Sequence, residues 1–596
     1  MSRDFQQSFA IGEVVADRVV AFELVRELGK PATLDIEVQF SEDATADNAI
    51  GQEAYFTFGF EGEPAHEFAG VINAVTLVGT PALGGIGVIS SGSAHRVRLS
   101  VVSQLHTISG IVTARILQDK DVKEIVELVL DDHGIKKDKQ RWSLKGTYAK
   151  REYCVQYFES SLAFVSRLCE EEGIYFWQGV EDGSEVFYFA DESPSASPIE
   201  GDADLPMRGL AGGVTDSDTI FGLREHAKTR SGKFVLRDYD FKRPSLDMTA
   251  EAEAEADTDL ERYDYPGLYF EPSVGKHLAK VRLEAEQAER ETIEMLVESP
   301  RLHAGFTITV SHVPSDDMAG DFLLTRVAHA YGRRVARHFR DFEVEVAREA
   351  RELYIAVAQA IPKAVPFRSP QVTPRPIVHG PTTAKVVAPA GSQDEAIHTD
   401  EHGRCKVKFP WDLGPDQDDK ASCWMRTGQL QTSGSMILPR IGWEVVVEYL
   451  EGNPDRPFVT GKLYNGLYMP PYSLPEGKTR TSMRTCSTPG GGGSNEIRLE
   501  DAAGIEEIMI NAQYDQTITT ANDKKRTVLN NSTRTVKAST STIDVGAATG
   551  DDHRSATMAG YLLLQPGHPV GNGNGLQRRD QLNGQEQVDR CCATTR

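Results

Sequence analysis

Apolar side chains recur at every third or fourth position in three early segments, the spacing that places them on one face of an α-helix. The first predicted helix runs from Asp121 to His133, where Asp121 and Glu124 have the spacing of a capping box. The second runs from about Ser160 to Glu172 and ends at Gly173. The third runs from Val274 to about Thr292 and has a charged outer face. The rest of residues 1–361 alternates as short strands do, which predicts a mixture of strands and helices.

Residues 249–265 (TAEAEAEADTDLERYDY) alternate alanine with glutamate, and seven acids face the single Arg262. The alternation resembles a strand, but the segment has no β-branched residue in its alternating part. We therefore expect an exposed, solvated acidic loop, with an acidic partner-binding edge as the alternative.

Residues 382–468 read as short strands separated by tight Gly and Asp turns. Five strands in so short a stretch predict a small Greek-key barrel of the OB type. The expected strands are 383–387, 405–409, 435–439, 444–450 and 457–463.

From Asn495 to about Gly546 the pattern changes to one apolar side chain in eight residues. Ile510 and Ile518 have this spacing, and so do Val528 and Val536 after a two-residue slip. So sparse a repeat cannot form the core of one chain, whereas stacked strands from several chains could bury these positions along a shared axis. The pattern predicts a β-helical needle.

Composition excludes several classes of function. Lys plus Arg total 64 and Asp plus Glu 88, so the net charge is −24, which disfavours nucleic acid and anionic membranes as partners. The predicted barrel contains Phe409, Trp411, Trp424 and Trp443, but acids lie between them, so we expect these aromatics in its core rather than in a nucleic-acid groove. No apolar run has the length of a membrane span, and we expect no membrane anchoring.

The start of the chain, MSRDFQQSFAIGEVV, lacks the apolar core of a signal peptide. We expect folding in the cytoplasm, with any export by a non-standard route. The 7 cysteines are scattered and odd in number, and they predict reduced thiols rather than a disulfide framework. Cys591 and Cys592 are adjacent in the tail, where they give only a weak indication of metal binding or reactivity.

The strongest candidate for chemistry is His398-Thr-Asp-Glu401-His402, which matches a zinc-binding pattern and lies close to Cys405. That pattern holds a metal only on a helix, where residues four apart share a face. Gly403 follows at once and leads into a strand, so we expect a hairpin loop and no metal. The glycines of 489–494 (PGGGGS) lack the Lys-Ser/Thr of a phosphate-binding loop and predict a flexible connector. We expect no catalytic residue and no cofactor.

Long strings carry a resemblance to a known family. The chain resembles the VgrG family, the spike proteins of bacterial type VI secretion systems, in the same order over roughly residues 1–540. The strings are REYCVQYFESSLAFVSRLCEEEGIYF (151–176), LRDYDFKRPS (236–245), YDYPG (263–267), TDEHGRCKVKFPWD (399–412), SCWMR (422–426), EGNPDRPFVTG (451–461) and NEIRLEDAAGIEEI (495–508).

The resemblance implies a mainly β protein with some helices (α+β), related to the hub and spike of contractile phage tails. The implied regions are 1–361, a phage-hub-like region of paired β-barrel subdomains with helices; 362–381, a Pro-rich linker; 382–468, the OB-fold barrel; 469–494, a Pro/Gly-rich connector; 495–546, a short trimeric β-helical needle; and 547–596, a loose tail. About 30 residues separate Tyr464 from Asn495, too few for the lysozyme domain that the phage counterpart carries there.

The implied function is that of a non-enzymatic homotrimeric spike. It would cap the hexameric Hcp tube, contact baseplate components, carry a PAAR-type tip protein or effectors, and leave the cell through the type VI apparatus. Two alternatives remain: the hub and spike of a related injection particle or prophage tail, and a metal hydrolase that uses His398 and His402. The tail departs from the family, so the resemblance does not extend to its role.

Overall fold

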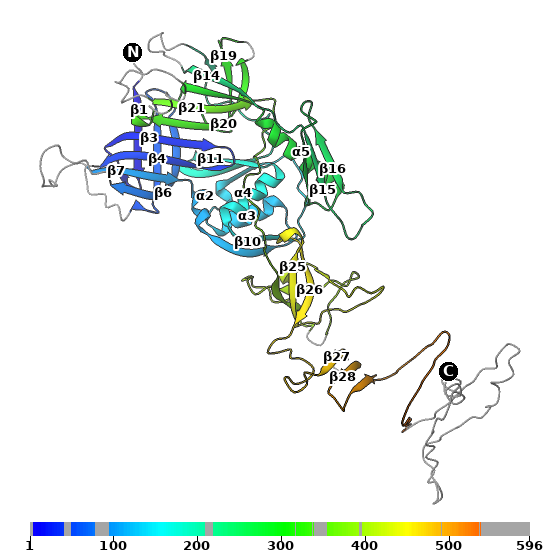
Figure 1. Ribbon diagram of the computed structural model, residues 1–596. Coiled ribbons are helices and arrows are strands. Elements are labelled where there is room, and N and C mark those ends of the chain that lie inside the picture. Colours follow the sequence, from blue (N-terminus) through cyan, green and yellow to red (C-terminus); the bar gives the residue numbers. More distant parts are fainter. Residues whose placement is uncertain are drawn as a thin grey trace, which may run out of the picture. The chain divides into compact units, whose positions relative to one another are not determined.

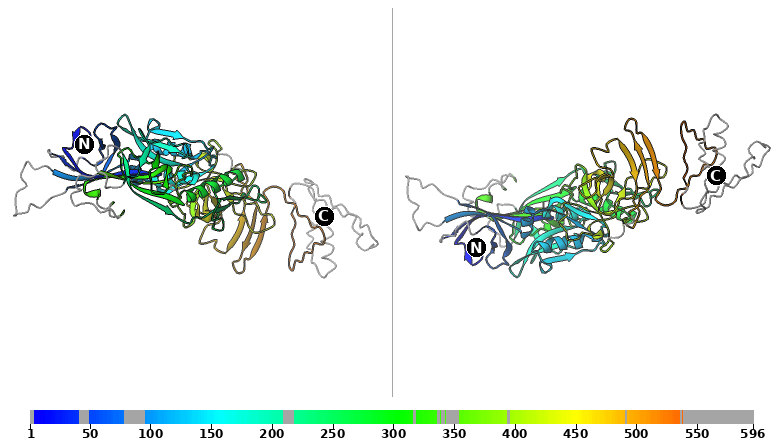
Figure 2. Two further views of the ribbon diagram at one scale, coloured as in Figure 1. Left: turned by 90° about the horizontal axis from the view of Figure 1, so that it is seen from above. Right: turned by 90° about the horizontal axis from the view of Figure 1, so that it is seen from below.

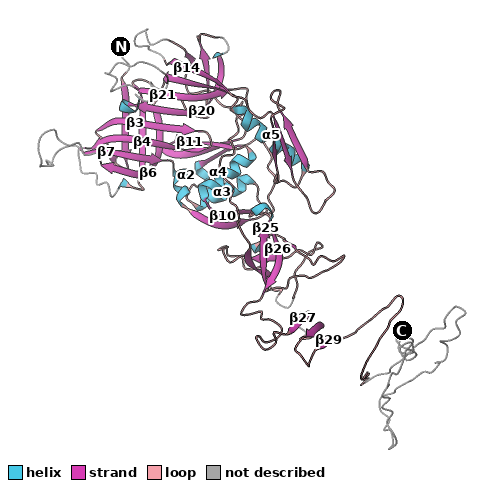
Figure 3. Cartoon of the chain, viewed as in Figure 1, coloured by secondary structure: helices cyan, strands magenta, loops and turns pink. Residues whose placement is uncertain are grey.

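The computed structural model describes residues 4–40, 49–77, 95–208, 218–315, 318–335, 338, 342, 354–392, 396–489, 492–535 and 537. The predictions for Val536, for the end of the needle near Gly546 and for the tail with Cys591 and Cys592 lie outside these residues. The chain divides into two compact units, Met1–Pro470 and Pro471–Arg596. Strands dominate and helices are few, which confirms the predicted fold class (Figure 3).

A 13-stranded sheet, here called the large sheet, makes up most of the N-terminal part (Figure 1). Its strands alternate buried and exposed side chains, and the buried ones form a core rich in phenylalanine that includes Phe9, Phe22, Phe56 and Phe58. The order is β14-β18-β21-β20-β3-β4-β7-β6-β5-β1-β2, and β19 joins β13 to β20 beside this path. The bounds are β1 Phe5–Ile11, β2 Val14–Val15, β3 Arg18–Glu27, β4 Lys30–Phe40, β5 Glu53–Phe60, β6 His66–Leu77, β7 His95–Val102, β13 Asp204–Pro206, β14 Thr219–Ala227, β18 Glu291–Glu298, β19 Thr307–Ser311, β20 Gly320–Tyr331 and β21 Tyr354–Pro362.

A second layer, here called the helical module, contains the first two predicted helices. Both are confirmed: α3 begins after Asp121, whose capping box with Glu124 is present, and α4 runs from a Ser160 cap to Gly173 in the left-handed conformation. Their apolar faces form one core with the strands beside them, and Figure 1 shows α3 and α4 between β10 and β11. The elements are α2 Gln104–Thr107, β8 Val112–Leu117, α3 Val122–Asp132, β9 Gln140–Ser143, β10 Cys154–Ser160, α4 Ser161–Glu172, β11 Tyr175–Glu181 and β12 Ser184–Ala190.

The third predicted helix is shorter than expected. Helix α5 spans Pro272–Ala288, and Glu291 already begins strand β18, which pairs with β14 and β21. The prediction to Thr292 was wrong because helix-favouring side chains continue past the point where sheet pairing takes over.

The acidic segment is also not the loop that we expected. It contains β16 (Thr249–Glu253) and β17 (Glu261–Asp264), which flank β15 (Lys233–Arg237) in a three-stranded sheet. Its alanines face α5, and the Lys233 ammonium lies 2.9–3.6 Å from three glutamates of the two outer strands. Packing on α5 and charge pairing with Lys233 thus stabilise β16 and β17, whose alanines and glutamates have low intrinsic strand propensity.

The Pro-rich segment after β21 has no regular secondary structure but packs closely on the helical module. Glu170 of α4 accepts hydrogen bonds from the backbone N–H groups of Val372 and Thr373 at 3.1 and 2.9 Å. The Arg368 guanidinium forms an ion pair with Glu284 of α5 at 2.8 Å. The segment is therefore held along its length by side chains of two helices.

The barrel that follows has a five-stranded sheet in the order β23-β22-β25-β26-β24 around a small core. Four expected strands are present, but 435–439 is not one of them, because it belongs to an exposed loop. The fifth strand is the short β24, which pairs in parallel with β26. The bounds are β22 Thr382–Val387, β23 Lys406–Lys408, β24 Arg426–Thr427, β25 Glu444–Tyr449 and β26 Pro457–Leu463.

The second unit contains a three-stranded antiparallel sheet, visible in orange in Figure 2. Its strands are β27 Arg480–Arg484, β28 Glu496–Glu500 and β29 Glu507–Asn511. Residues 512–535 have no assigned strand, and nearly all of their side chains are exposed. No helix in the described parts of the chain is long and apolar enough to cross a bilayer.

Candidate functional site

The residues of the zinc-like pattern do not converge. The His398 Nε2 atom lies 3.7 Å from Asp419, the Glu401 side chain is 86% exposed, and burial raises the pKa of Cys405 to about 11. Among the described residues, no group of His, Cys, Asp and Glu is arranged to hold a metal ion. The segment is a turn that leads into β23, as the glycine after His402 predicted.

The segment that follows β15 meets the barrel through a buried ion pair. Arg456 of the barrel donates two hydrogen bonds to the Asp238 carboxylate, at 2.8 and 2.6 Å. The same carboxylate accepts hydrogen bonds from the backbone N–H groups of Tyr239 and Leu268. The Asp238 side chain is fully buried and that of Arg456 is 13% exposed, so removal of either partner would leave a buried charge without its counterpart.

Two further contacts surround this pair. The Asp455 carboxylate accepts a hydrogen bond from the backbone N–H of Val155 at 2.7 Å, and burial raises the pKa of Asp455. The indole ring of Trp411 meets the Tyr157 ring edge-on, with ring centroids 5.6 Å apart. Both contacts join β10 of the helical module to the barrel.

Phe241 forms the third part of this contact. The guanidinium groups of Arg404 and Arg426, both from the barrel, lie 5.4 and 5.2 Å from its ring centroid. The His402 ring meets it edge-on at 5.5 Å. His402 belongs to the zinc-like pattern, at which we expected no metal, and it packs on an aromatic ring.

We call these contacts the joint. Residues from five of the strings meet there although they are up to 300 positions apart. Sequence analysis did not identify these residues as a site, because positions so far apart in the chain give no sign that they are in contact. All of them nevertheless lie within the segments that carry the family resemblance. The joint residues are Val155, Tyr157, Asp238, Phe241, His402, Arg404, Trp411, Arg426, Asp455 and Arg456.

A cluster of histidines surrounds a buried arginine in the large sheet. Arg26 donates a hydrogen bond to the Glu67 carbonyl oxygen at 2.6 Å and contacts the His66 ring. The His66 ring centroid lies 4.8 Å from that of His329 and 5.7 Å from that of His303. Burial and the Arg26 charge lower the pKa of all three histidines, that of His303 to about 3. These rings are therefore neutral and structural at physiological pH.

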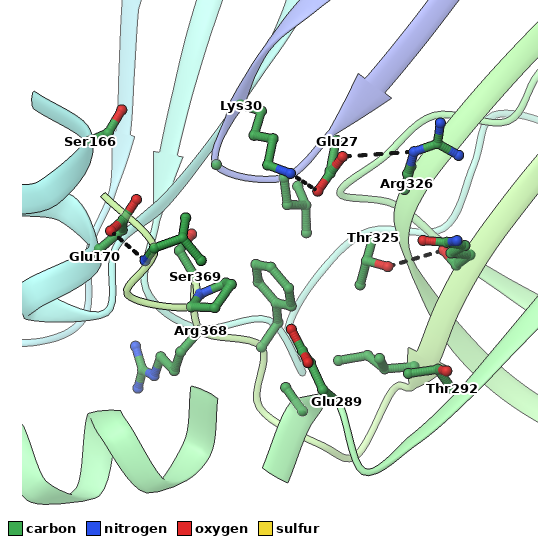
Figure 4. Close-up of a pocket in the computed structure, with 18 of the residues that line it drawn as sticks. Glu27, Lys30, Ser166, Glu170, Glu289, Thr292, Thr325, Arg326, Arg368 and Ser369 are labelled. Carbon is green, nitrogen blue, oxygen red and sulfur yellow. Dashed lines mark hydrogen bonds and ion pairs between the residues drawn. The ribbon is translucent and has the colours of Figure 1, made fainter. Parts of the chain in front are cut away.

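A cavity of about 470 Å³ lies between the β3–β4 turn, the end of α5 and the Pro-rich segment. Its charged groups pair with one another, as Figure 4 shows for Lys30 with Glu27 and for Glu27 with Arg326. Gly29 lines the wall at φ +77°, and a Cβ there would lie 2.7 Å from the Ser369 Oγ atom. The absence of a side chain at Gly29 lets the Pro-rich segment approach the β3–β4 turn closely at Ser369.

The second unit presents apolar side chains that the described residues leave exposed. Large aliphatic residues of β28, β29 and the turn between them are 38–73% exposed, and Ile510 and Ile518 of the predicted repeat are 60% and 66% exposed. Ile497 pairs with Ile510 and Leu499 with Ile508 across β28 and β29, so these four side chains are neighbours. Soluble monomers rarely expose large groups of neighbouring apolar side chains. The exposed aliphatic residues are Ile497, Leu499, Ile505, Ile508, Ile510, Ile518 and Leu529.

Comparison with known proteins shows three family models along the chain. The model of the phage tail baseplate hub matches residues 25–334, that of the type VI secretion system/phage-baseplate injector OB domain matches 393–464, and that of the bacteriophage T4 gp5 C-terminal trimerisation domain matches 481–554.

Curated relatives agree. The chain is 36% identical over 523 residues to the type VI secretion system spike protein VgrG5 of Pseudomonas aeruginosa, with 85% of this chain and 63% of the relative covered. It is 34% identical over 447 residues to the actin cross-linking toxin VgrG1 of Vibrio cholerae, with 74% of this chain and 40% of the relative covered. The chain thus spans less than two thirds of the length of either relative.

A solved structure is similar in fold. An Escherichia coli component of the type VI secretion system, described as structurally similar to the T4 tail proteins gp27 and gp5, aligns with a TM-score of 0.53 at 21% identity and covers 76% of this chain and 99% of its own. The hub model alone matches more than half of the chain. The chain therefore belongs to the family of phage tail baseplate hub proteins that includes the VgrG spike proteins of type VI secretion systems.

Proposed function

We propose that the chain is the structural spike of a type VI secretion system and works as a homotrimer. The observation that carries this proposal is the order of the three matched regions: hub, injector OB domain and trimerisation domain. The division into the regions 1–361, 382–468 and 495–546, with 362–381 and 469–494 between them and 547–596 as a tail, is part of the proposal.

Trimerisation has a physical reason in the second unit. Its exposed isoleucines and leucines would leave water if strands from three chains stacked around one axis. A closed trimer also covers strand edges that a single chain leaves unpaired. A β-helical needle of three chains is therefore the assembly that we propose for residues 495–546.

The proposed partners follow from the family. The hub would dock on the hexameric Hcp tube and on baseplate components, and the needle would receive a PAAR-type tip protein or an effector. The spike would assemble in the cytoplasm and leave through the apparatus.

We propose a structural rather than an enzymatic role for the described part of the chain. One relative is named as an actin cross-linking toxin, but this chain spans 40% of that relative. The described residues that a zinc hydrolase would use, His398 and His402, contact Asp419 and Phe241 instead of a common centre.

Light scattering on the full chain tests the trimer. We expect a mass near three times 65.5 kDa. Ile508→Glu on β29, 73% exposed in one chain, is expected to shift the protein toward monomer. Leu467→Glu is the matched control, because Leu467 is 87% exposed but lies in the first unit. A monomer with the unaltered sequence would refute the trimer.

A cellular assay tests the role. In a strain that lacks every other spike gene, deletion of this gene should abolish release of the tube protein into the medium, and the intact gene should restore it. Release that continues without the gene would refute the spike function. The phage-hub match favours a second candidate, the hub of a related contractile particle, which the neighbouring genes would distinguish.

A further inference from the structure

The barrel carries an exposed loop, residues 428–437, here called the barrel arm. It presents Leu430, Met436 and Ile437 at 61%, 81% and 49% exposure. The arm has a defined shape of its own, because the Gln429 amide donates to and accepts from the backbone of Ile437 at 3.1 and 2.8 Å. The Ser435 hydroxyl also donates to the Leu430 carbonyl oxygen at 2.8 Å. These apolar side chains are thus held away from their own barrel core.

A second apolar surface lies on the helical module. Phe158 sits in a β-bulge of β10 at φ +49°, an unfavourable backbone conformation for a bulky residue. Its ring meets Trp411 of the barrel edge-on, with ring centroids 6.4 Å apart, and is still 57% exposed. Val112, which pairs with Ser160 across the two-stranded sheet, is 62% exposed, and the adjacent Ile111 is 40% exposed. We call Ile111, Val112 and Phe158 the module patch.

The arm and one of the two segments that form the patch lack charged residues. The arm, GQLQTSGSMI, contains no charged residue, nor does the segment TISGIVTA (107–114) that holds two residues of the module patch, in a chain that is 26% charged. Burying them together would desolvate no ionised side chain from these segments. An uncharged contact also suits two chains that each carry a net charge of −24, since like charges across an interface repel.

A ring of three identical chains needs two different surfaces on each chain, because the contact around a threefold axis is heterologous. We propose that the barrel arm of one copy packs on the module patch of the next copy. This inference rests on the proposed homotrimer and names the surfaces through which its N-terminal units meet. The Met436 and Ile437 side chains would cover Phe158 and Val112 of the neighbouring copy.

Cysteine cross-linking tests the contact in the full chain. Val112→Cys and Met436→Cys are combined in a chain whose Cys486, Cys591 and Cys592 are replaced by serine, and a short bismaleimide is added. We expect covalent dimers and trimers on a denaturing gel. A chain with only one of the two introduced cysteines should give none. The control pair Val372→Cys with Met436→Cys should give none either, because Val372 is 65% exposed but lies outside the module patch.

The outcomes separate this contact from the trimer itself. A trimeric mass without cross-linked bands would overturn the contact and leave the trimer intact, whereas a monomeric mass would remove both. A fast-migrating monomer band would mean that the arm reaches the patch of its own chain, which also overturns the inference. As a second readout, Met436→Ser with Ile437→Ser should raise the concentration at which the trimer dissociates by about tenfold or more. An unchanged dissociation concentration would count against the contact.

Discussion

Replacement of His329 by asparagine should weaken the pH dependence of the stability of the large sheet. The His329 ring is fully buried, and its Nε2–H group donates to the Leu302 carbonyl oxygen at 3.0 Å while Nδ1 faces the Tyr354 hydroxyl at 2.7 Å. Burial, with the nearby Arg26 charge as a second cause, lowers the pKa of His329 well below its usual value of about 6.5. The folded protein therefore holds this ring neutral when an unfolded chain would protonate it.

The sign follows from proton linkage. As the pH falls below about 6.5, the unfolded chain binds a proton that the folded chain refuses, so the free energy of unfolding decreases. For one such histidine the loss is about 1.4 kcal/mol at pH 5.5 and below about 0.1 kcal/mol at pH 7.5. His66 and His303 act in the same direction. Glu185 opposes them, because burial raises its pKa to about 7 and protonation at lower pH relieves the cost of its buried charge.

The assay is urea unfolding followed by tryptophan fluorescence at pH 7.5 and pH 5.5, at constant ionic strength. His329→Asn is expected to lower stability at both pH values, because it disturbs packing and hydrogen bonds. The difference between the two pH values should shrink by about 1.4 kcal/mol relative to the unaltered chain. Glu185 is present in both proteins and cancels from this comparison. An unchanged difference would show that the pKa of His329 is the same in the folded and unfolded chains and would refute the reasoning.

Three further predictions concern the joint, the cavity wall and metal. Arg456→Gln should lower the stability measured in thermal unfolding by about 3 kcal/mol, since it leaves the buried Asp238 carboxylate without its ion-pair partner. Adding Asp238→Asn should recover part of this loss. A double variant that is no more stable than Arg456→Gln alone would argue against the ion pair. Gly29→Ala should lower the free energy of unfolding by about 2 kcal/mol, because Gly29 has φ +77° and a Cβ would lie 2.7 Å from the Ser369 Oγ atom. Gly12→Ala is the control, since Gly12 also has a positive φ, +56°, but open space around it. Equal losses for the two variants in urea unfolding would exclude the contact with Ser369 as the cause. Dialysis against EDTA should leave the melting temperature unchanged, and a lower melting temperature that zinc restores would revive the site at His398 and His402.

Helices with local end signals were predictable. The capping box of Asp121 and the left-handed Gly173 act within one turn, so the sequence around them suffices to place the ends of α3 and α4. The far end of α5 and strands β16 and β17 depend on partners elsewhere in the chain. Alanines and glutamates form strands there because β15 pairs with them and α5 covers them.

The sequence indicated the segments that contain the joint residues, but not that these residues contact one another. Asp238 and Arg456 are 218 positions apart, and nothing in the spacing of either pairs them. The expected strand 435–439 has an apolar sequence that suits a strand, but its Met436 and Ile437 are exposed and lie in the barrel arm. A pattern of apolar residues does not say whether they are covered by their own chain or by another.

The Pro-rich segment has a mechanical consequence. The sequence predicts a linker here, yet Glu170 accepts hydrogen bonds from its backbone, and Arg368 and Arg375 pair with Glu284 and Glu171. Because these contacts fix the segment at several positions, it cannot extend until some of them break. A load applied to the barrel would therefore reach α4 and α5 without first stretching a loose connection, and the segment would yield one ion pair at a time rather than uncoil.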